Sequence, residues 1–304
     1  MQRKGVRGMT DAVVSILEQG LIYGIMALGV YISYTILDFP DLSVDGTFPL
    51  GTAVCVALVT LGWNPWLCLL AAFVCGCAAG AFTGLLNVHL RIKNLLCGIL
   101  TMTALYSVNY RIAGASNVFL DMTQPTIFTW PGTFLPPAAA KLTVAAVIAL
   151  AAKFLMDWYL RTKSGFLLRS VGDNEGLVIT LAQNSGNVKI LGLAISNGLV
   201  ALAGAVNAQY TRQFSVSGGT GTVVMGLAAV IIGATVFRRV RFVRVTTGVL
   251  FGMMIYKACT YAALASGLQA MDTNLVITVL FIVTLFINQF VLERGGKGGV
   301  KHRA

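Results

Sequence analysis

Only a few polar or charged side chains of this chain lie inside apolar stretches, where they could do chemistry. Lys257 lies well inside the apolar stretch 245–264, and such a position is costly for a lysine unless it faces protein, water or an outer interface. Lys257 therefore fits two roles, a place on a solute pathway or a side chain that reaches to the membrane surface. Asn197 and Asn207 lie on roughly the same side of a helix at 188–210. They fit either a polar seam between helices or the wall of a solute pathway.

Three charged residues recur at intervals of four near the end of the stretch 141–160. Lys153, Asp157 and Arg161 share one face of a helix at this spacing. We expect them to form ion pairs at the end of that helix.

Motifs for catalysis are absent from the sequence. It has no G-x-x-x-x-G-K-[ST] phosphate loop, no H-E-x-x-H and no G-x-S-x-G. The six Cys lie in apolar stretches and there are two His, so we expect the Cys to be packing residues. We therefore expect no catalytic residue, no cofactor and no metal in this chain, and we do not expect an enzyme.

The composition indicates a membrane protein. The chain has 304 residues, of which 57% are hydrophobic and 11% are charged, against about 25% charged in a soluble domain. Because a bilayer core needs about 20 apolar residues per helix, we expect an all-α, polytopic membrane helix bundle of 8–10 transmembrane segments in a single domain, 1–304. The candidate segments are 13–37, 46–61, 65–88, 95–113, 141–160, 188–210, 221–237, 245–264 and 273–291. Gly76, Gly80 and Gly84 recur every four residues and predict a narrow groove for a neighbouring helix.

The basic residues predict which loops are cytoplasmic. The connections 89–94, 161–189 and 238–244 and the tail are rich in Lys and Arg, whereas the alternate loops hold only Lys141 and Arg212. We expect a cytoplasmic N-terminal segment at 1–12, a cytoplasmic coupling loop at 161–189 and a cytoplasmic tail at 293–304. Nine complete spans would instead leave the N-terminus outside, so one early element is expected to cross incompletely.

The stretch 38–61 is the best candidate for that incomplete element. It opens with three Asp and two Pro, in the sequence DFPDLSVDGTFP. Irregular backbone at membrane depth persists only inside protein or beside a water-filled cavity. We therefore expect a broken or re-entrant element here.

The loop 161–189 is too long for a tight turn and carries the signals of a short helix. Asp173 or Asn174 can cap it, Glu175 is in its first turn, and Gly186 can end it. Its apolar stripe consists of Leu177, Val178, Leu181 and Ala182. The pattern predicts a helix that docks a soluble partner, or one that lies on the membrane interface.

Three stretches of this chain, 164–210, 20–51 and 219–237, together carry a family resemblance. They read SGFLLRSVGDNEGLVITLAQNSGNVKILGLAISNGLVALAGAVNAQY, GLIYGIMALGVYISYTILDFPDLSVDGTFPLG and GTGTVVMGLAAVIIGATVF. This set resembles the type II ABC importer permeases, the branched-chain amino acid and ribose permease superfamily. The DFPDLSVDG form is similar to a subgroup paired with binding proteins for tryptophan, tyrosine or related solutes. The chain departs from the family at 238–244, where RRVRFVR replaces a Gly-Gly-rich turn.

The resemblance implies the membrane-spanning subunit of an ABC importer in a bacterial cell (inner) membrane. It implies two permease copies, most simply a homodimer, with separate ATPase subunits that bind ATP and Mg and an extracytoplasmic binding protein that delivers a small solute. An amino acid is the solute that the subgroup suggests. The alternatives are a secondary transporter or channel, and a membrane scaffold that transports nothing.

Two sets of residues are expected to carry this function. The expected contact with the ATPase consists of Gly172, Asp173, Asn174, Glu175, Leu177 and Leu181. The candidates for the pathway lining are Asp41, Asp45, Phe48, Asn197, Asn207 and Lys257.

Overall fold

The polytopic helix bundle expected from the sequence is confirmed. The computed structural model describes residues 2–129, 137–174, 184–237 and 244–265, together with 275, 278, 279 and 281–286. Five of the described helices are long and apolar enough to cross a membrane, namely Ala12–Ile36, Pro65–Val88, Ala139–Tyr159, Ser185–Thr211 and Val245–Ala265. Two shorter apolar helices accompany them, Val44–Thr60 and Thr222–Phe237.

The elements are arranged along the chain as a series of helices with one small sheet. The helices are α1 (Gln2–Val30), the π-helix η1 (Tyr31–Ile36), α2 (Val44–Thr60), α3 (Pro65–Val88), α4 (Asn94–Ala113), α5 (Pro137–Tyr159), α6 (Lys163–Asp173), α8 (Ser185–Thr211), α9 (Thr222–Phe237) and α10 (Val245–Ala265). The strands β1 (Asn117–Phe119) and β2 (Gln213–Ser215) pair antiparallel, with Val118 opposite Phe214. This pair joins the segment after α4 to the segment after α8.

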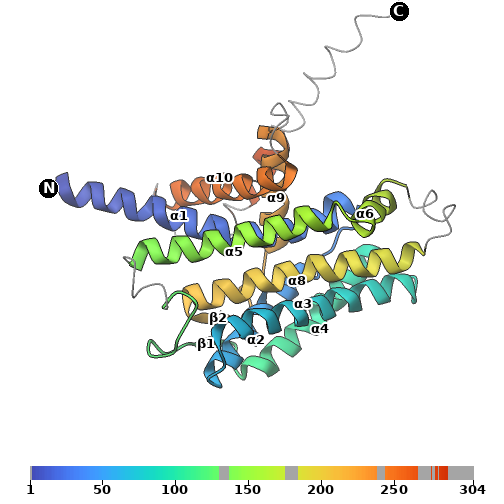
Figure 1. The fold of residues 1–304 in the computed structure, drawn as a ribbon, viewed down its shortest axis with the longest axis horizontal. Coiled ribbons are helices and arrows are strands. Elements are labelled where there is room, and N and C mark those ends of the chain that lie inside the picture. Colours follow the sequence, from blue (N-terminus) through green and yellow to red (C-terminus); the bar gives the residue numbers. More distant parts are fainter. Residues whose placement is uncertain are drawn as a thin grey trace, which may run out of the picture.

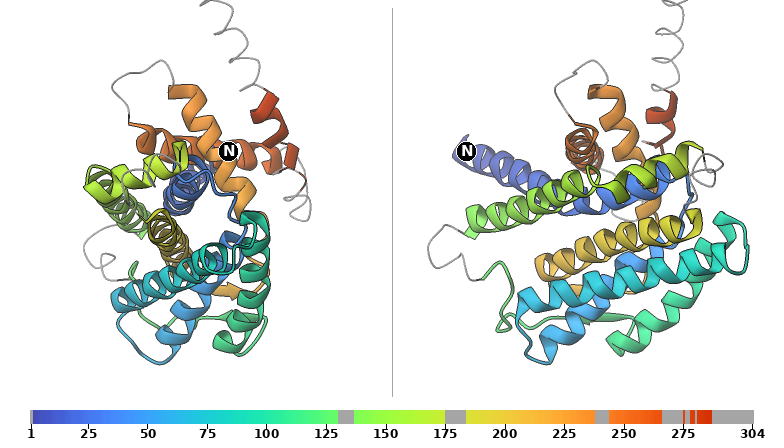
Figure 2. Two further views of the ribbon diagram at one scale, coloured as in Figure 1. Left: turned by 90° about the vertical axis from the view of Figure 1, so that its right-hand side faces the viewer. Right: turned by 45° about the vertical axis from the view of Figure 1, so that its right-hand side comes forward.

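Helix α8 lies at the centre of the bundle. Figures 1 and 2 show it between α5 and α3, and it also packs against α1 and α2. Glycines allow the close approach of α3, because a Cβ on Gly80 would overlap the carbonyl oxygen of Leu193 and one on Gly76 would overlap that of Asn197. The groove expected at Gly76, Gly80 and Gly84 is confirmed, and the helix that fills it is α8.

Helices α2 and α9 begin inside the bundle. Ser43 and Thr47, at the start of α2, bond to Asn197, which lies near the middle of α8. The chain reaches that depth from η1 through the non-helical segment 37–43. The break expected at the start of 38–61 is therefore present, and it is enclosed by protein, as the absence of water in a bilayer core requires.

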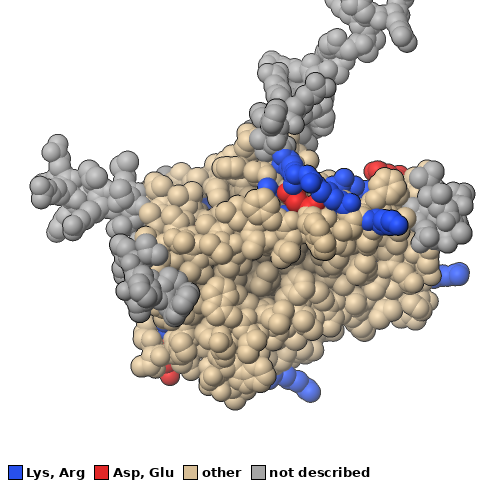
Figure 3. Space-filling model, viewed as in Figure 1, with Lys and Arg blue, Asp and Glu red and all other residues tan. Residues whose placement is uncertain are grey.

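The direction of α1 bears on the expected topology. Helix α1 begins at the end of the bundle opposite α6, and η1, which continues α1, packs against α6 (Figure 1). Segments 1–12 and 161–174 therefore lie at opposite ends of the bundle, and the side of the membrane on which each lies stays a prediction. Figure 3 shows Lys and Arg gathered over α5 and α6 on a face that is otherwise mostly uncharged.

Candidate functional site

A buried polar cluster holds the break before α2. The Nδ2 of Asn197 donates to Asp41 Oδ2 at 2.8 Å, and Asn197 Oδ1 accepts from the hydroxyls of Ser43 (3.2 Å) and Thr47 (2.7 Å). Asp41 Oδ1 accepts from the backbone N–H of Ser43 at 2.8 Å. All four residues are at most 1% exposed. Asp41 and Asn197 are thus brought together, but as a seam that fixes the start of α2 rather than as an open lining.

Asp45 joins α2 to α9. Its Oδ1 accepts from the Thr222 hydroxyl (2.8 Å) and the Val223 N–H (2.9 Å), and its Oδ2 accepts from the Gly221 N–H (3.1 Å). A carboxylate at a helix N-terminus satisfies backbone donors that the helix leaves free, and the helix dipole favours it there. Gly221 has a φ of +82°, a conformation that suits glycine at this turn. Asp45 therefore fixes the start of α9 against the start of α2.

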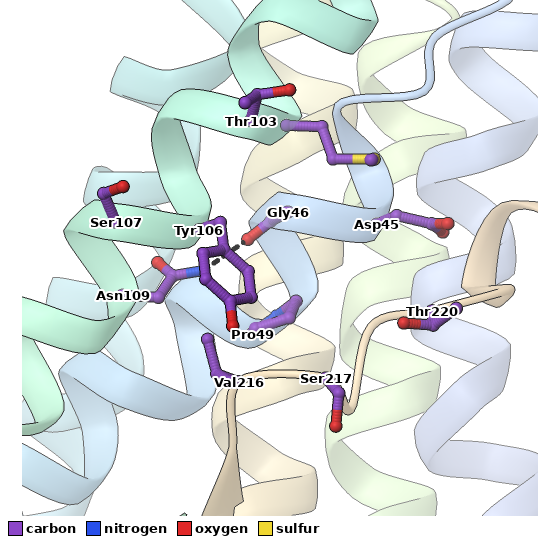
Figure 4. A pocket seen from close by; sticks show the side chains of 11 residues that line it. Asp45, Gly46, Pro49, Thr103, Tyr106, Ser107, Asn109, Val216, Ser217 and Thr220 are labelled. Atoms are coloured by element: carbon purple, nitrogen blue, oxygen red, sulfur yellow. Dashed lines mark hydrogen bonds between the residues drawn. The ribbon is translucent and has the colours of Figure 1, made fainter. Parts of the chain in front are cut away.

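A cavity of about 410 Å³ opens beside this junction. Helix α2 lines it with Asp45, Gly46 and Pro49, helix α4 lies across from α2, and the segment after β2 closes a third side (Figure 4). Asn109 on α4 donates from Nδ2 to the Gly46 carbonyl at 2.9 Å, which pins α4 to α2. Of the six pathway candidates from the sequence, only Asp45 lines this cavity.

Helix α4 presents a polar face to the cavity, and the sequence analysis did not identify this face. Thr103, Tyr106 and Ser107 are exposed and line the cavity. The Thr103 hydroxyl donates to the Ile99 carbonyl of its own helix at 2.8 Å, whereas lipid would offer no partner to the hydroxyls of Tyr106 and Ser107. This face is therefore suited to water, solute or protein. The signal was the recurrence of hydroxyl residues at i, i+3 and i+4 within 95–113, which places them on one side of a helix.

Phe48 and Lys257 both contact the ring of Tyr23, away from the cavity. The Phe48 ring stacks on Tyr23 with 5.5 Å between centroids, and the Lys257 Nζ lies 3.6 Å from the centroid of the Tyr23 ring. This cation–π contact accounts for a lysine at this depth, and neither Phe48 nor Lys257 lines the cavity. Asn207 is half-buried on α8 and lines neither site.

The expected pairing at the end of α5 is confirmed for two of the three residues. Lys153 Nζ lies 3.3 Å from Asp157 Oδ2. Asp157 also accepts from Arg244 (2.8 Å) and from the Thr246 hydroxyl (2.7 Å) at the start of α10. The carboxylate of Asp157 therefore links α5 to α10.

In its described part the coupling loop contains a helix that the sequence analysis did not expect, α6. Helix α6 ends at Asp173, one of the two residues expected to cap the next helix, and Gly186 lies in the first turn of α8. Asn184 caps α8 by accepting from the Gly186 N–H at 3.0 Å. Asp173 and Asn174 are exposed.

Gly172 packs so closely on η1 that a Cβ would overlap the carbonyl oxygen of Ile36. The remaining coupling candidates, Glu175, Leu177 and Leu181, lie outside the described residues. So does most of the arginine-rich connection, 238–243.

Comparison with known proteins identifies the family. A family model described as the permease component of branched-chain amino acid transport systems matches residues 12–288. The tyrosine transport system permease protein of Clostridioides difficile (strain R20291) is 40% identical over 275 residues, which cover 90% of each chain. The ribose import permease protein of Escherichia coli (strain K12) is 27% identical over 224 residues, 73% of this chain and 68% of that protein. No solved structure matches.

A further curated relative spans nearly the whole chain. An inner membrane ABC transporter permease protein of Escherichia coli (strain K12) is 27% identical over 291 residues, 94% of this chain and 84% of its own length. With the family model matching most of the sequence, the chain belongs to the family of branched-chain amino acid transport system permease components, the type II permeases of ABC transport systems.

Proposed function

We propose that this permease carries a small solute, an amino acid, across a bacterial inner membrane, and that its pathway runs past the junction of α2 and α9. Two copies enclose the pathway, a binding protein delivers the solute from outside, and separate ATPase subunits hold ATP and Mg. The observation that carries the proposal is the junction itself, where two short apolar helices begin inside the bundle beside a cavity with a polar wall. Helices broken at mid-membrane occur where backbone lines a cavity.

An amino acid is favoured by one relative. The tyrosine transport system permease is 40% identical over 90% of both chains. The ribose import permease is 27% identical over a shorter region. We therefore take the solute class, an amino acid, from the tyrosine transport system permease.

The contacts of α6 support a route from the ATPase to the junction. Gly172 on α6 lies against the Ile36 carbonyl of η1, and Leu168 of α6 meets Leu37 at Gly192 of α8. Segment 37–43 follows directly and leads through Asp41 to the start of α2. Because packed elements move as units, a displacement of α6 by the ATPase would move η1 and then the junction.

Co-purification with the ATPase subunit tests this proposal. We expect Leu177→Asp/Leu181→Asp to lose the ATPase while the permease stays folded, because charges on the stripe oppose docking. Leu61→Asp is the control, since Leu61 is 73% exposed in the turn after α2, away from α6. The wild type in proteoliposomes with both partners should accumulate labelled tyrosine and hydrolyse ATP in response to it.

Three outcomes are distinguishable. If the double variant keeps the ATPase and its solute-dependent ATP turnover, the assignment of the coupling stripe is wrong. If the wild type retains no ATPase, the secondary transporter or channel and the scaffold become the better hypotheses. If the complex forms and hydrolyses ATP without moving an amino acid, the solute class is wrong.

A further inference from the structure

We propose that the cavity between α2, α4 and the segment after β2 is a solute-binding site of the permease itself. Its ligand class is a small uncharged or zwitterionic molecule that has N–H or O–H donors at one end and an apolar, ring-sized portion at the other. Anions without a positive group are excluded. This inference rests on the proposed function, because it names the kind of solute that the pathway accepts.

The polar part of the lining accepts and donates hydrogen bonds without a fixed positive charge. Thr103 and Ser107 of α4 and Ser217 and Thr220 of the segment after β2 line two sides of the cavity (Figure 4). A hydroxyl can donate to a carboxylate and accept from an ammonium or amide. Such a lining fits a zwitterion as well as a neutral solute.

The charge of the lining argues against anions. Asp45 is the one charged residue among the lining residues that the structure describes, and no Lys or Arg accompanies it there. Its carboxylate bonds to the start of α9, which holds it in place beside the cavity. An anionic solute would lose water beside the like charge of Asp45 and would find no cation in the lining. An ammonium group would instead find the opposite charge of the Asp45 carboxylate.

Asn109 shapes the same wall by holding α4 against α2. It is 1% exposed, and its Nδ2 donates to the Gly46 carbonyl at 2.9 Å. Its Oδ1 is buried, so the solute contacts on α4 fall to the exposed residues that line the cavity.

The lining also contains apolar groups and an aromatic ring. The Tyr106 ring reaches from α4 toward Pro49 and Val216 (Figure 4), and Met102 lines the same cavity. A ring and a thioether form a suitable surface for a flat apolar group. The cavity volume of about 410 Å³ lies at the small end of the range for ligand pockets, which suits a solute of amino acid size. A lipid chain is a poor occupant, because it would offer no hydrogen-bond partner to the Tyr106 and Ser107 hydroxyls.

Thiol protection tests the ligand class without the binding protein. Ser107→Cys is introduced with the exposed Cys259 replaced by Ala, and the permease–ATPase complex is treated with a membrane-permeant thiol reagent. We expect millimolar L-tyrosine to slow modification of the new cysteine several-fold. We expect 3-(4-hydroxyphenyl)propionate, an anion with the same ring but no ammonium group, to leave it unchanged at equal concentration. Tyr110→Cys is the matched control, because Tyr110 is exposed on α4 within one turn but does not line the cavity. Its labelling should respond to neither solute.

Uptake by the complete transporter gives the second measurement. We expect Tyr106→Ala to raise the KM for tyrosine about tenfold, equivalent to a loss of about 1.4 kcal/mol, and Tyr110→Ala to leave it within about twofold. ATP turnover without solute should be unchanged in Tyr110→Ala, which shows that the complex is intact.

The outcomes separate this inference from the function beneath it. Equal labelling of the Ser107→Cys site with and without tyrosine, together with an unchanged KM in Tyr106→Ala, overturns the binding site and leaves amino acid transport standing. Protection by 3-(4-hydroxyphenyl)propionate equal to that by tyrosine overturns the ligand class. A wild type that takes up no amino acid overturns the proposed function, and with it the inference.

Discussion

Asp45 offers the sharpest test of how the two broken helices are held together. Hydrogen bonds to a charged acceptor contribute about 1.5–3 kcal/mol each, and a carboxylate at a helix N-terminus adds about 0.3–1 kcal/mol. Asp45 accepts three such bonds from the start of α9, but water from the adjacent cavity can replace part of them. We expect Asp45→Ala to lower the free energy of unfolding by about 3–5 kcal/mol.

Asp45→Asn should cost less, about 2 kcal/mol. The amide oxygen still accepts from Thr222 and Val223, while the amide NH₂ meets the Gly221 N–H, donor against donor. The measurement is equilibrium unfolding of the purified permease in mixed detergent micelles. The control is Asp38→Asn in the same segment, because Asp38 is exposed and has a φ of +50°, which asparagine tolerates. Equal unfolding midpoints for Asp45→Asn and Asp38→Asn would refute the idea that Asp45 holds α9.

Three further substitutions probe the elements around the junction. Asn197→Ala should lower the free energy of unfolding by about 2–4 kcal/mol, because it removes four buried hydrogen bonds, while Asn207→Ala on the same helix should change it by at most about 1 kcal/mol in the same unfolding assay. Gly172→Val should separate ATP turnover from uptake in proteoliposomes, since a Cβ has no room beside η1; normal coupling would contradict the proposed route. Lys257→Met should leave the KM for uptake within about twofold and lower stability by about 0.5–2 kcal/mol, the worth of its contact with the Tyr23 ring; a large rise in KM would instead place Lys257 on the pathway.

Local sequence patterns were sufficient for the fold class and for the break. Long apolar stretches predict spanning helices because bilayer thickness fixes their length. The dense Asp and Pro of 38–49 predict a break because neither residue type suits a lipid-facing helix. The Lys153–Asp157 pair was also predictable from a local pattern, because residues four apart in a helix are neighbours whatever the tertiary structure.

The contacts that form the candidate site were not predictable in this way. Asp45 meets Thr222, and Asn109 meets Gly46, across long separations in the chain. The spacing of residues within one helix does not indicate such contacts, because they form only when α2, α4 and α9 pack together. Helix α6 carries a local signal that was overlooked, because Thr162 caps it by accepting from the Gly165 N–H. The close packing of Gly172 on Ile36 is instead a tertiary contact that no local pattern shows.

The hydrogen bonds at the junction connect stability with movement. A helix that begins at membrane depth leaves N–H groups that lipid cannot satisfy, so α9 can begin there only while an acceptor such as Asp45 is supplied. Asp45 stands in the first turn of α2, whose position depends on Asp41 and on the chain that descends from η1. Any displacement of η1 must therefore carry α2 and α9 together or break bonds at a cost of several kcal/mol. Because Asp45 also lines the cavity, movement of this unit changes the wall that a solute meets, and this is the physical reason to expect that the site opens and closes as a consequence of contact at α6.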